Sequence, residues 1–222
     1  MSKQPISADN SQNSPSAYPE GNSNQYGGKL VRGKVVFVGA SGVGKTSLVF
    51  SYLNEDINHP PTVGASSITC NVKLGNETIT LNVWDTAGQD EFKFLMPVYA
   101  RGAEVAVVVY DTSNGETFEV IDEWVNYFLE TVPPGNIILV GNKIDLPLDI
   151  DEKIVFEYKH SKNIPYIRTS ALTKEGINEL FLQIAECVQK NKIVEASEVH
   201  QQIVLPDRQS LTPPPKQQND CC

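Results

Sequence analysis

The chain is short of the residues that build several kinds of site. Its 222 residues include four cysteines, too few for a disulfide scaffold at this length. The three histidines show no ligand spacing, so neither a zinc site nor a histidine-dependent triad is predicted. No apolar run is long enough to cross a bilayer. The formal net charge of −9 argues against nucleic acid as a partner, because its phosphates would be repelled.

Apolar residues are also scarce at both ends of the chain. Residues 1–28 consist largely of Ser, Asn, Gln, Pro and Gly, and they lack the apolar core of a signal peptide. From residue 194 the chain again becomes polar and proline-rich. We therefore predict a disordered extension over 1–28, one domain over 29–193 and a disordered tail over 194–222.

Between these ends, strand and helix patterns alternate. Residues 68–83 alternate apolar and polar side chains around a Gly-Asn pair, which predicts an antiparallel hairpin. Residues 105–110 and 137–140 are continuous apolar runs, typical of strands buried on both faces. Residues 177–188 have apolar side chains at helical spacing, which predicts a helix packed on the sheet. The pattern indicates an open α/β sheet, which binds ligands at the carboxyl ends of its strands.

Residues 39–46 form the pattern G-x-x-x-x-G-K-[ST] of a phosphate-binding loop. An apolar strand precedes the loop and a helix-like stretch follows it, so backbone N–H groups and a helix N-terminus would face phosphate oxygens. Lys45 would reach the terminal phosphates, and the Thr46 hydroxyl would bind magnesium. A glycine turn with an incidental lysine is the alternative. The predicted phosphate contacts from this loop are Ser41, Gly42, Val43, Gly44, Lys45, Thr46 and Ser47.

The residues expected to select the base come later, after another apolar strand. Asn142-Lys143-Ile144-Asp145 supplies a carboxylate that can accept hydrogen bonds from both N1–H and the N2 amine of guanine. Adenine has an acceptor at N1 and no N2 amine, so Asp145 predicts guanine. The Lys143 stem would lie along the purine face, and a backbone N–H within Thr169-Ser170-Ala171 would donate to guanine O6. Taken alone, the tetrapeptide is equally compatible with a polar turn.

The residues expected to bind magnesium and position water lie between these two motifs. Asp85 ends an alternating strand and suits an outer-shell magnesium role. Gly88 can bring its N–H against the γ-phosphate because no side chain blocks the approach. Gln89 can hold an attacking water with its acceptor and donor groups. Upstream, Thr62 and the residues after it offer a hydroxyl for the metal and an N–H for the γ-phosphate, although a threonine alone would indicate only a loop.

Arginine is scarce too, and its placement bears on catalysis. The chain has only Arg32, Arg101, Arg168 and Arg208. None lies between the phosphate loop and Gln89, so no arginine there can neutralise charge that develops on a transferred phosphoryl group. We therefore expect slow hydrolysis and a partner that inserts an arginine, an effect worth about 10³–10⁵ in rate.

Taken in order, these motifs resemble those of the Ras superfamily of small GTPases, and in detail those of the Rab family. The resemblance covers roughly residues 29–192 and the last two residues. It implies a P-loop NTPase three-layer sandwich, α/β in class, with a six-stranded mostly parallel sheet, one antiparallel strand and helices on both faces. Ala65 is similar to the early-endosomal Rab branch. The Rab-like segments are Trp84-Asp85-Thr86-Ala87-Gly88-Gln89, Tyr99-Ala100-Arg101-Gly102-Ala103, Val109-Tyr110-Asp111 and Cys221-Cys222.

The resemblance also implies the ligands and the residue roles. GTP and GDP would be the nucleotides and Mg²⁺ the cofactor, and the reaction would be hydrolysis of GTP to GDP and phosphate. The implied catalytic residues are Gln89, Lys45 and Thr62. Magnesium would be bound by Thr46 and Thr62, and by Asp85 through water. The implied guanine-binding residues are Asn142, Lys143, Asp145, Ser170, Ala171 and Leu172.

Partners and location follow from the same resemblance. The partners would be a guanine nucleotide exchange factor, a GTPase-activating protein that supplies an arginine, a GDP-dissociation inhibitor, a prenylation escort protein and trafficking effectors. The protein would act in the cytosol and on the cytoplasmic face of endomembranes, with endosomes as one candidate.

The ending Cys221-Cys222 is similar to a Rab site for two geranylgeranyl groups. Two lipids would be needed, since one lipid binds only marginally and the tail has no polybasic patch. Chance and metal binding are the alternatives. Ile203-Val204-Leu205 resembles the segment held by the escort protein, or it contacts the domain surface.

Several positions depart from the Rab pattern. The segment from Lys45 to Thr62 is about one residue short, and Ile57 stands where Rabs usually place an aromatic ring against guanine. An aliphatic contact lacks edge-to-face geometry, a difference of order 1 kcal/mol, so we expect faster spontaneous nucleotide release. Asp90-Glu91 replaces the usual Glu-Arg, and Leu172 replaces a lysine.

Two functions of different classes fit these motifs. The favoured one is a nucleotide-cycling membrane switch in vesicle trafficking, with an effector surface around residues 62–67 and 84–98. The other is a GTP-binding scaffold that hardly cycles. An ATPase or a nucleoside kinase is a third, more distant interpretation.

Overall fold

A computed structural model describes residues 31–202 except 59, 61, 63, 87, 89–94, 134 and 135, with side chains described as far as residue 194. Strands and helices alternate along this part of the chain. In chain order the elements are β1 (Val31–Val38), α1 (Lys45–Leu53), β2 (Ala65–Leu74), β3 (Glu77–Thr86), α2 (Met96–Ala100), β4 (Val105–Asp111), α3 (Glu116–Glu119), α4 (Ile121–Leu129), β5 (Ile137–Asn142), α5 (Glu152–Lys162), β6 (Tyr166–Arg168) and α6 (Ile177–Gln202).

The strands form one sheet in the order β2-β3-β1-β4-β5-β6. β1 pairs in parallel with β3 and β4, β4 with β5, and β5 with β6. β2 runs antiparallel to β3 through the expected hairpin, with Leu74 opposite Glu77. The expected fold is confirmed: a six-stranded, mostly parallel sheet with one antiparallel strand.

The central strands are apolar along their whole length because both of their faces are covered. Every residue of β4 and β5 is buried. β2, at the edge of the sheet, instead mixes exposed and buried positions. The continuous apolar runs in the sequence therefore mark strands that are covered on two sides.

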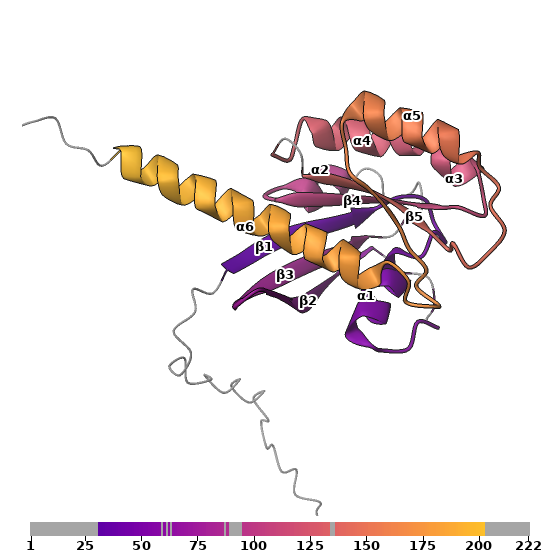
Figure 1. Ribbon diagram of the computed structural model, residues 1–222, viewed down its shortest axis with the longest axis horizontal. Coiled ribbons are helices and arrows are strands. Elements are labelled where there is room, and N and C mark those ends of the chain that lie inside the picture. Colours follow the sequence, from indigo (N-terminus) through magenta and orange to yellow (C-terminus); the bar gives the residue numbers. More distant parts are fainter. Residues whose placement is uncertain are drawn as a thin grey trace, which may run out of the picture.

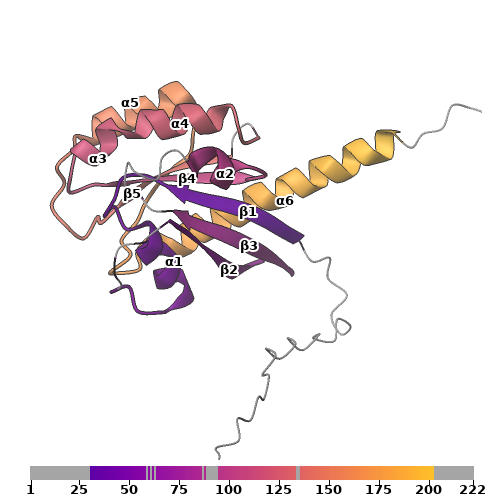
Figure 2. The same ribbon diagram turned by 180° about the vertical axis from the view of Figure 1, so that it is seen from behind.

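Helices cover the two faces of the sheet. Figures 1 and 2 show α1 and α6 on one face and α2 to α5 on the other. Trp124, Val125 and Phe128 of α4 pack on the second face. The predicted apolar stripe of the last helix is confirmed as core on the first face, and its residues are Ile177, Leu180, Phe181, Ile184, Ala185 and Val188.

The last helix, α6, continues to Gln202, whereas the sequence predicts that the polar tail begins at residue 194. Figure 1 shows this end of the helix running on past the sheet. Alanine and glutamate in this stretch are compatible with helix, which explains how the helix can extend beyond its packed part. Within the described part of the chain, no helix combines the length and apolar character needed to cross a membrane.

The two cysteines within the described residues are both buried free thiols, as expected. Cys70 lies in β2 and Cys187 in α6, and both belong to the core on the same face of the sheet. They fill space rather than form a site. Cys221, Cys222 and the extension predicted over 1–28 lie outside the described residues.

Candidate functional site

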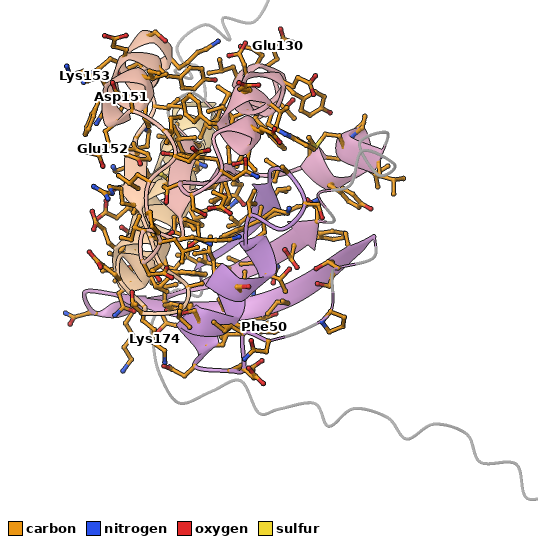
Figure 3. All side chains as sticks on the ribbon, turned by 90° about the vertical axis from the view of Figure 1, so that its right-hand side faces the viewer. Phe50, Glu130, Asp151, Glu152, Lys153 and Lys174 are labelled. Atoms are coloured by element: carbon orange, nitrogen blue, oxygen red, sulfur yellow. The ribbon has the colours of Figure 1, made fainter. Side chains whose placement is uncertain are left out.

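The predicted site residues gather at one edge of the sheet, where the parallel strands end. Figure 3 views the molecule from this side. An open parallel sheet commonly binds ligands at this edge. A cavity of about 210 Å³ lies here, and its lining residues are Ser41, Gly42, Gly44, Lys45, Thr46, Ser47, Pro60, Thr62, Thr86 and Gly88.

The loop between β1 and α1 forms the floor of this cavity. Gly44 has φ +94°, and a Cβ at this position would lie 2.4 Å from the side-chain nitrogen of Asn142. Only glycine combines this backbone conformation with so close a contact. α1 begins directly at Lys45, and its first residues line the cavity, so a helix N-terminus is available to an anion. The Val43 side chain is buried in the core, which leaves only its backbone for the predicted phosphate contact.

Lys45 places a cation in the cavity, although its side chain is almost fully buried. Its Nζ donates to the carbonyl oxygen of Gly39 at 2.9 Å and to that of Ala40 at 2.8 Å. Burial lowers the pKa of Lys45 to about 8, and the nearby Asp85 carboxylate opposes this shift. A phosphate in the cavity would favour the charged ammonium, so Lys45 suits an anionic ligand.

Three oxygen-bearing side chains meet beside Lys45. Thr46 Oγ1 donates to Asp85 Oδ2 at 2.5 Å and lies 2.8 Å from Thr62 Oγ1. Thr62 Oγ1 also donates a hydrogen bond to Asp85 Oδ2 at 3.2 Å. Two hydroxyls and one carboxylate are the hard oxygen ligands that Mg²⁺ prefers when phosphates complete its shell. The residues predicted to bind the metal therefore lie together, and their chemistry fits Mg²⁺.

Gly88 borders the cavity from the β3 side. A Cβ at Gly88 would lie 2.4 Å from the carbonyl carbon and oxygen of Ala40 and 2.5 Å from the carbonyl oxygen of Gly39. Those atoms are backbone, so they cannot move aside as a flexible side chain could. Glycine is thus required for this contact with the phosphate loop. The expected N–H contact to a γ-phosphate stays a prediction.

Asn142 connects the phosphate loop to the loop after β6. Its Nδ2 donates to the Val43 carbonyl oxygen at 2.9 Å. Its Oδ1 accepts from Thr169 Oγ1 and from the Ala171 N–H, both at 3.2 Å. Asn142 was expected to contact guanine, yet its buried amide is bonded to these two loops and braces them. The Ala171 N–H, a candidate donor to guanine O6, is one of its partners.

Lys143 is held by Asp111, a residue that the sequence motifs did not assign to the site. Lys143 has φ +67°, and its Nζ lies 2.7 Å from Asp111 Oδ2. Burial disfavours the charged form of Asp111, but hydrogen bonds from Lys143 and Ser113 outweigh it and hold the pKa of this carboxyl below its ordinary value. Asp111 ends β4 opposite Asn142 of β5. In the sequence, the signal that could have identified Asp111 as a site residue is a polar residue at the end of a buried apolar run.

Asp145 lies beside the loop after β6, as the sequence predicts. Ser170 Oγ donates to Asp145 Oδ1 at 2.5 Å and accepts from the Thr173 N–H at 3.0 Å. Ser170 is fully buried, whereas Asp145 is exposed. The carboxylate is therefore oriented by a fixed hydroxyl, and Leu172, 68% exposed, presents its side chain nearby in the same loop.

The described residues leave some predictions unplaced. Gln89, which was expected to position the attacking water, lies outside them. Ile57 is half-buried in the segment that follows α1, and Pro60 lines the cavity. In the phosphate half, the structure thus leaves out residues 59, 61, 63, 87 and 89–94.

Comparisons with known proteins agree with this geometry. The model of the Ras family matches residues 34–190. The Ras-related proteins Rab-22A of mouse and of human are each 38% identical to this chain over 157 residues, which is 68% of this chain and 81% of each relative. This chain belongs to the Ras family. It is a Rab-like small GTPase, and GTPase activity is the general property of that family.

The lowered pKa of Lys45 predicts that the affinity of this Rab-like GTPase for GDP depends on pH. Bound phosphate favours the charged lysine, so binding takes up a proton once the pH exceeds about 8. GDP affinity should change little below about pH 7 and fall about five- to tenfold from pH 7.5 to 9. Titration with a fluorescent GDP analogue measures this. Lys45→Met should bind weakly without the pH dependence, and an affinity of the native protein that does not change over this range would contradict the prediction.

Proposed function

We propose that this Rab-like small GTPase is a switch that cycles between GTP and GDP and hydrolyses GTP slowly. The Asn142 side chain is the observation that best supports nucleotide binding by this switch, because it holds the phosphate loop and the base loop at one edge of the sheet. A nucleotide bound there would span both loops, with its phosphates near Lys45 and its base near Asp145.

In the phosphate half, each side chain has a distinct task. Lys45 balances the charge of the terminal phosphates, and Thr46 and Thr62 would bind Mg²⁺ while Asp85 orients its water. The metal would supply charge neutralisation for the phosphate groups. Thr62 lies in the segment before β2, whereas Thr46 lies in α1, so contacts made by both couple the nucleotide state to the position of that segment.

In the base half, Asp145 selects guanine and its neighbours fix its direction. Ser170 holds one carboxylate oxygen, and the Asp111–Lys143 ion pair holds the lysine that would cover the purine face. Asp111 lies opposite Asn142 in the sheet, so the β4–β5 pair places the Asp111–Lys143 ion pair, whereas Ser170 comes from the loop after β6.

Replacing Asp145 with asparagine should transfer base preference from guanine to xanthine. The carboxylate accepts from N1–H and the N2 amine of guanine, whereas an amide N–H can donate to the C2 carbonyl of xanthine. GDP affinity should fall about 100-fold or more, and XDP should become the tighter ligand. Competition against fluorescent GDP measures both changes. Native protein that bound ADP as tightly as GDP would refute guanine selection altogether.

Slow hydrolysis is supported by where the arginines lie. Arg168 pairs with Glu152, and none of the described arginines lines the cavity. An arginine that neutralises the negative charge developing on the transferred phosphoryl group would therefore have to come from a partner. We propose a GTPase-activating protein in this role, acting together with Gln89.

Replacing Gln89 with leucine distinguishes a cycling switch from a GTP-binding scaffold. Leucine cannot hold water, so single-turnover phosphate release from bound GTP should slow by at least about tenfold. GDP affinity should not change, because this side chain is not expected to contact the diphosphate. Equal release rates for the two proteins would favour the scaffold.

Membrane attachment and trafficking are part of the proposal. Two geranylgeranyl groups on Cys221 and Cys222 would anchor the chain to endomembranes, since one chain would give only marginal binding. An exchange factor, a GDP-dissociation inhibitor, an escort protein and effectors would then act on the switch. Ala65 favours an endosomal membrane, because an alanine after Thr62-Val63-Gly64 resembles the sequence of early-endosomal Rabs.

Removing the two terminal cysteines should shift the tagged protein from membranes into the cytosol. Replacing Cys222 alone with serine should leave partial membrane binding, because a single lipid chain anchors weakly and reversibly. Cell fractionation of the three proteins measures the membrane-bound share. Should all three distribute alike, the tail is not the anchor.

A further inference from the structure

A hydrogen bond joins two segments on the base side of the site that are 120 residues apart in the sequence. Lys174 Nζ donates to Asn54 Oδ1 at 2.8 Å. Asn54 ends α1, and Lys174 lies in the loop between β6 and α6. Figure 3 shows Lys174 and Phe50 of α1 at the same end of the molecule, with Lys153 of α5 at the opposite end.

The backbone at or beside each partner is held by local hydrogen bonds that do not involve the Lys174–Asn54 contact. Asn54 is left-handed with φ +60°, and its N–H donates to the Ser51 carbonyl oxygen at 3.2 Å. Lys174 is also left-handed, with φ +67°, and the preceding residue, Thr173, bonds to Ser170 Oγ. The pair therefore loses less conformational freedom than two mobile surface side chains would.

This hydrogen bond continues a network that begins at the guanine-selecting carboxylate. Ser170 Oγ donates to Asp145 and accepts from Thr173, the neighbour of Lys174. Asn54, at the other end, leads directly into the segment that holds Ile57 and ends at Thr62. The network thus connects the base loop to the segment that approaches the metal site.

We propose that the Lys174–Asn54 hydrogen bond is a latch that slows the release of guanine nucleotide. This inference rests on the proposed function, and it names the residues that regulate release from that site. In the proposed function the base would lie beside Asp145, near the loop of residues 170–174 and the segment of residues 54–58, and it would leave as these two separate. Lys174 and Asn54 are positioning residues, because they resist that separation without contacting the phosphates.

The latch explains how release can be restrained despite Ile57. An aliphatic side chain gives the base a weaker contact than an aromatic ring would. A link between the two flanking segments adds a second barrier to their separation. Because it lies on the base side, its effect should not depend on the metal.

Three variants test the latch through the rate of fluorescent GDP release from the full chain. Lys174→Met removes the donor, and Asn54→Gly removes the acceptor while tolerating the left-handed backbone. Each should speed release about 1.5- to 5-fold, with no further gain when both are combined. Asn54→Asp should slow release, because it converts the pair to an ion pair. The fold-changes should be the same with magnesium and with a chelator.

Two matched controls lie away from the latch. Asn163→Gly alters the left-handed residue that caps α5, and Lys153→Met alters an exposed lysine near the start of α5. Neither should change GDP release. Thermal unfolding of Lys174→Met should match that of the native protein, because the pair is exposed.

Release from Lys174→Met at the native rate would overturn the latch, and so would equal acceleration by the two controls. An additive effect of the two removals would also overturn it, because it would show that Lys174 and Asn54 act separately. Failure of the native protein to bind GDP at all is a different result. It would refute the proposed function and not the latch in particular.

Discussion

The site depends on the hydrogen bonds of one side chain, that of Asn142. Its amide nitrogen bonds to the phosphate loop and its amide oxygen bonds to the base loop, so one buried group sets the distance between the two halves. It sits at the end of β5, the strand that pairs with both β4 and β6. The closest approach, between Asn142 and Gly44, is possible only because Gly44 has no side chain. The pairing of β5 with its neighbouring strands thus determines where the two loops of the ligand site lie.

Local charge, and not the charge of the whole chain, suits the site to phosphate. The net charge is −9, which alone would repel an anion. Against this background the cavity combines a helix N-terminus with Lys45, while the negative Asp85 lies where two hydroxyls can join it around a cation. Lys143 is different, since Asp111 already neutralises it and leaves its stem to act by contact.

The fold and most of the candidate site residues could be predicted from the sequence, because the strands, the helices and the motifs are all local patterns. Buried strands, the hairpin and the α6 stripe follow from periodicity, and the phosphate loop is contiguous. The Asp111–Lys143 and Lys174–Asn54 pairs were not predicted, because each joins segments far apart in the chain and depends on distances that no local pattern contains. The bracing role of Asn142 escaped prediction for the same reason. The roles of Gln89 and the terminal cysteines stay predictions, since they lie outside the described residues.

The two halves of the site differ in how much substitution they can tolerate. In the phosphate half, a Cβ at Gly88 would collide with backbone atoms of Gly39 and Ala40, and a Cβ at Gly44 would collide with the buried Asn142 side chain. The base half depends on side-chain hydrogen bonds and an ion pair, in which buried Ser170 and Asp111 hold the more exposed Asp145 and Lys143. The departures from the Rab pattern fall on both sides: Ile57 and Leu172 lie on the base side, and Asp90-Glu91 follows Gln89 on the phosphate side. In the proposed function, the phosphate half would hold the nucleotide, and contacts in the base half would adjust how long it stays bound.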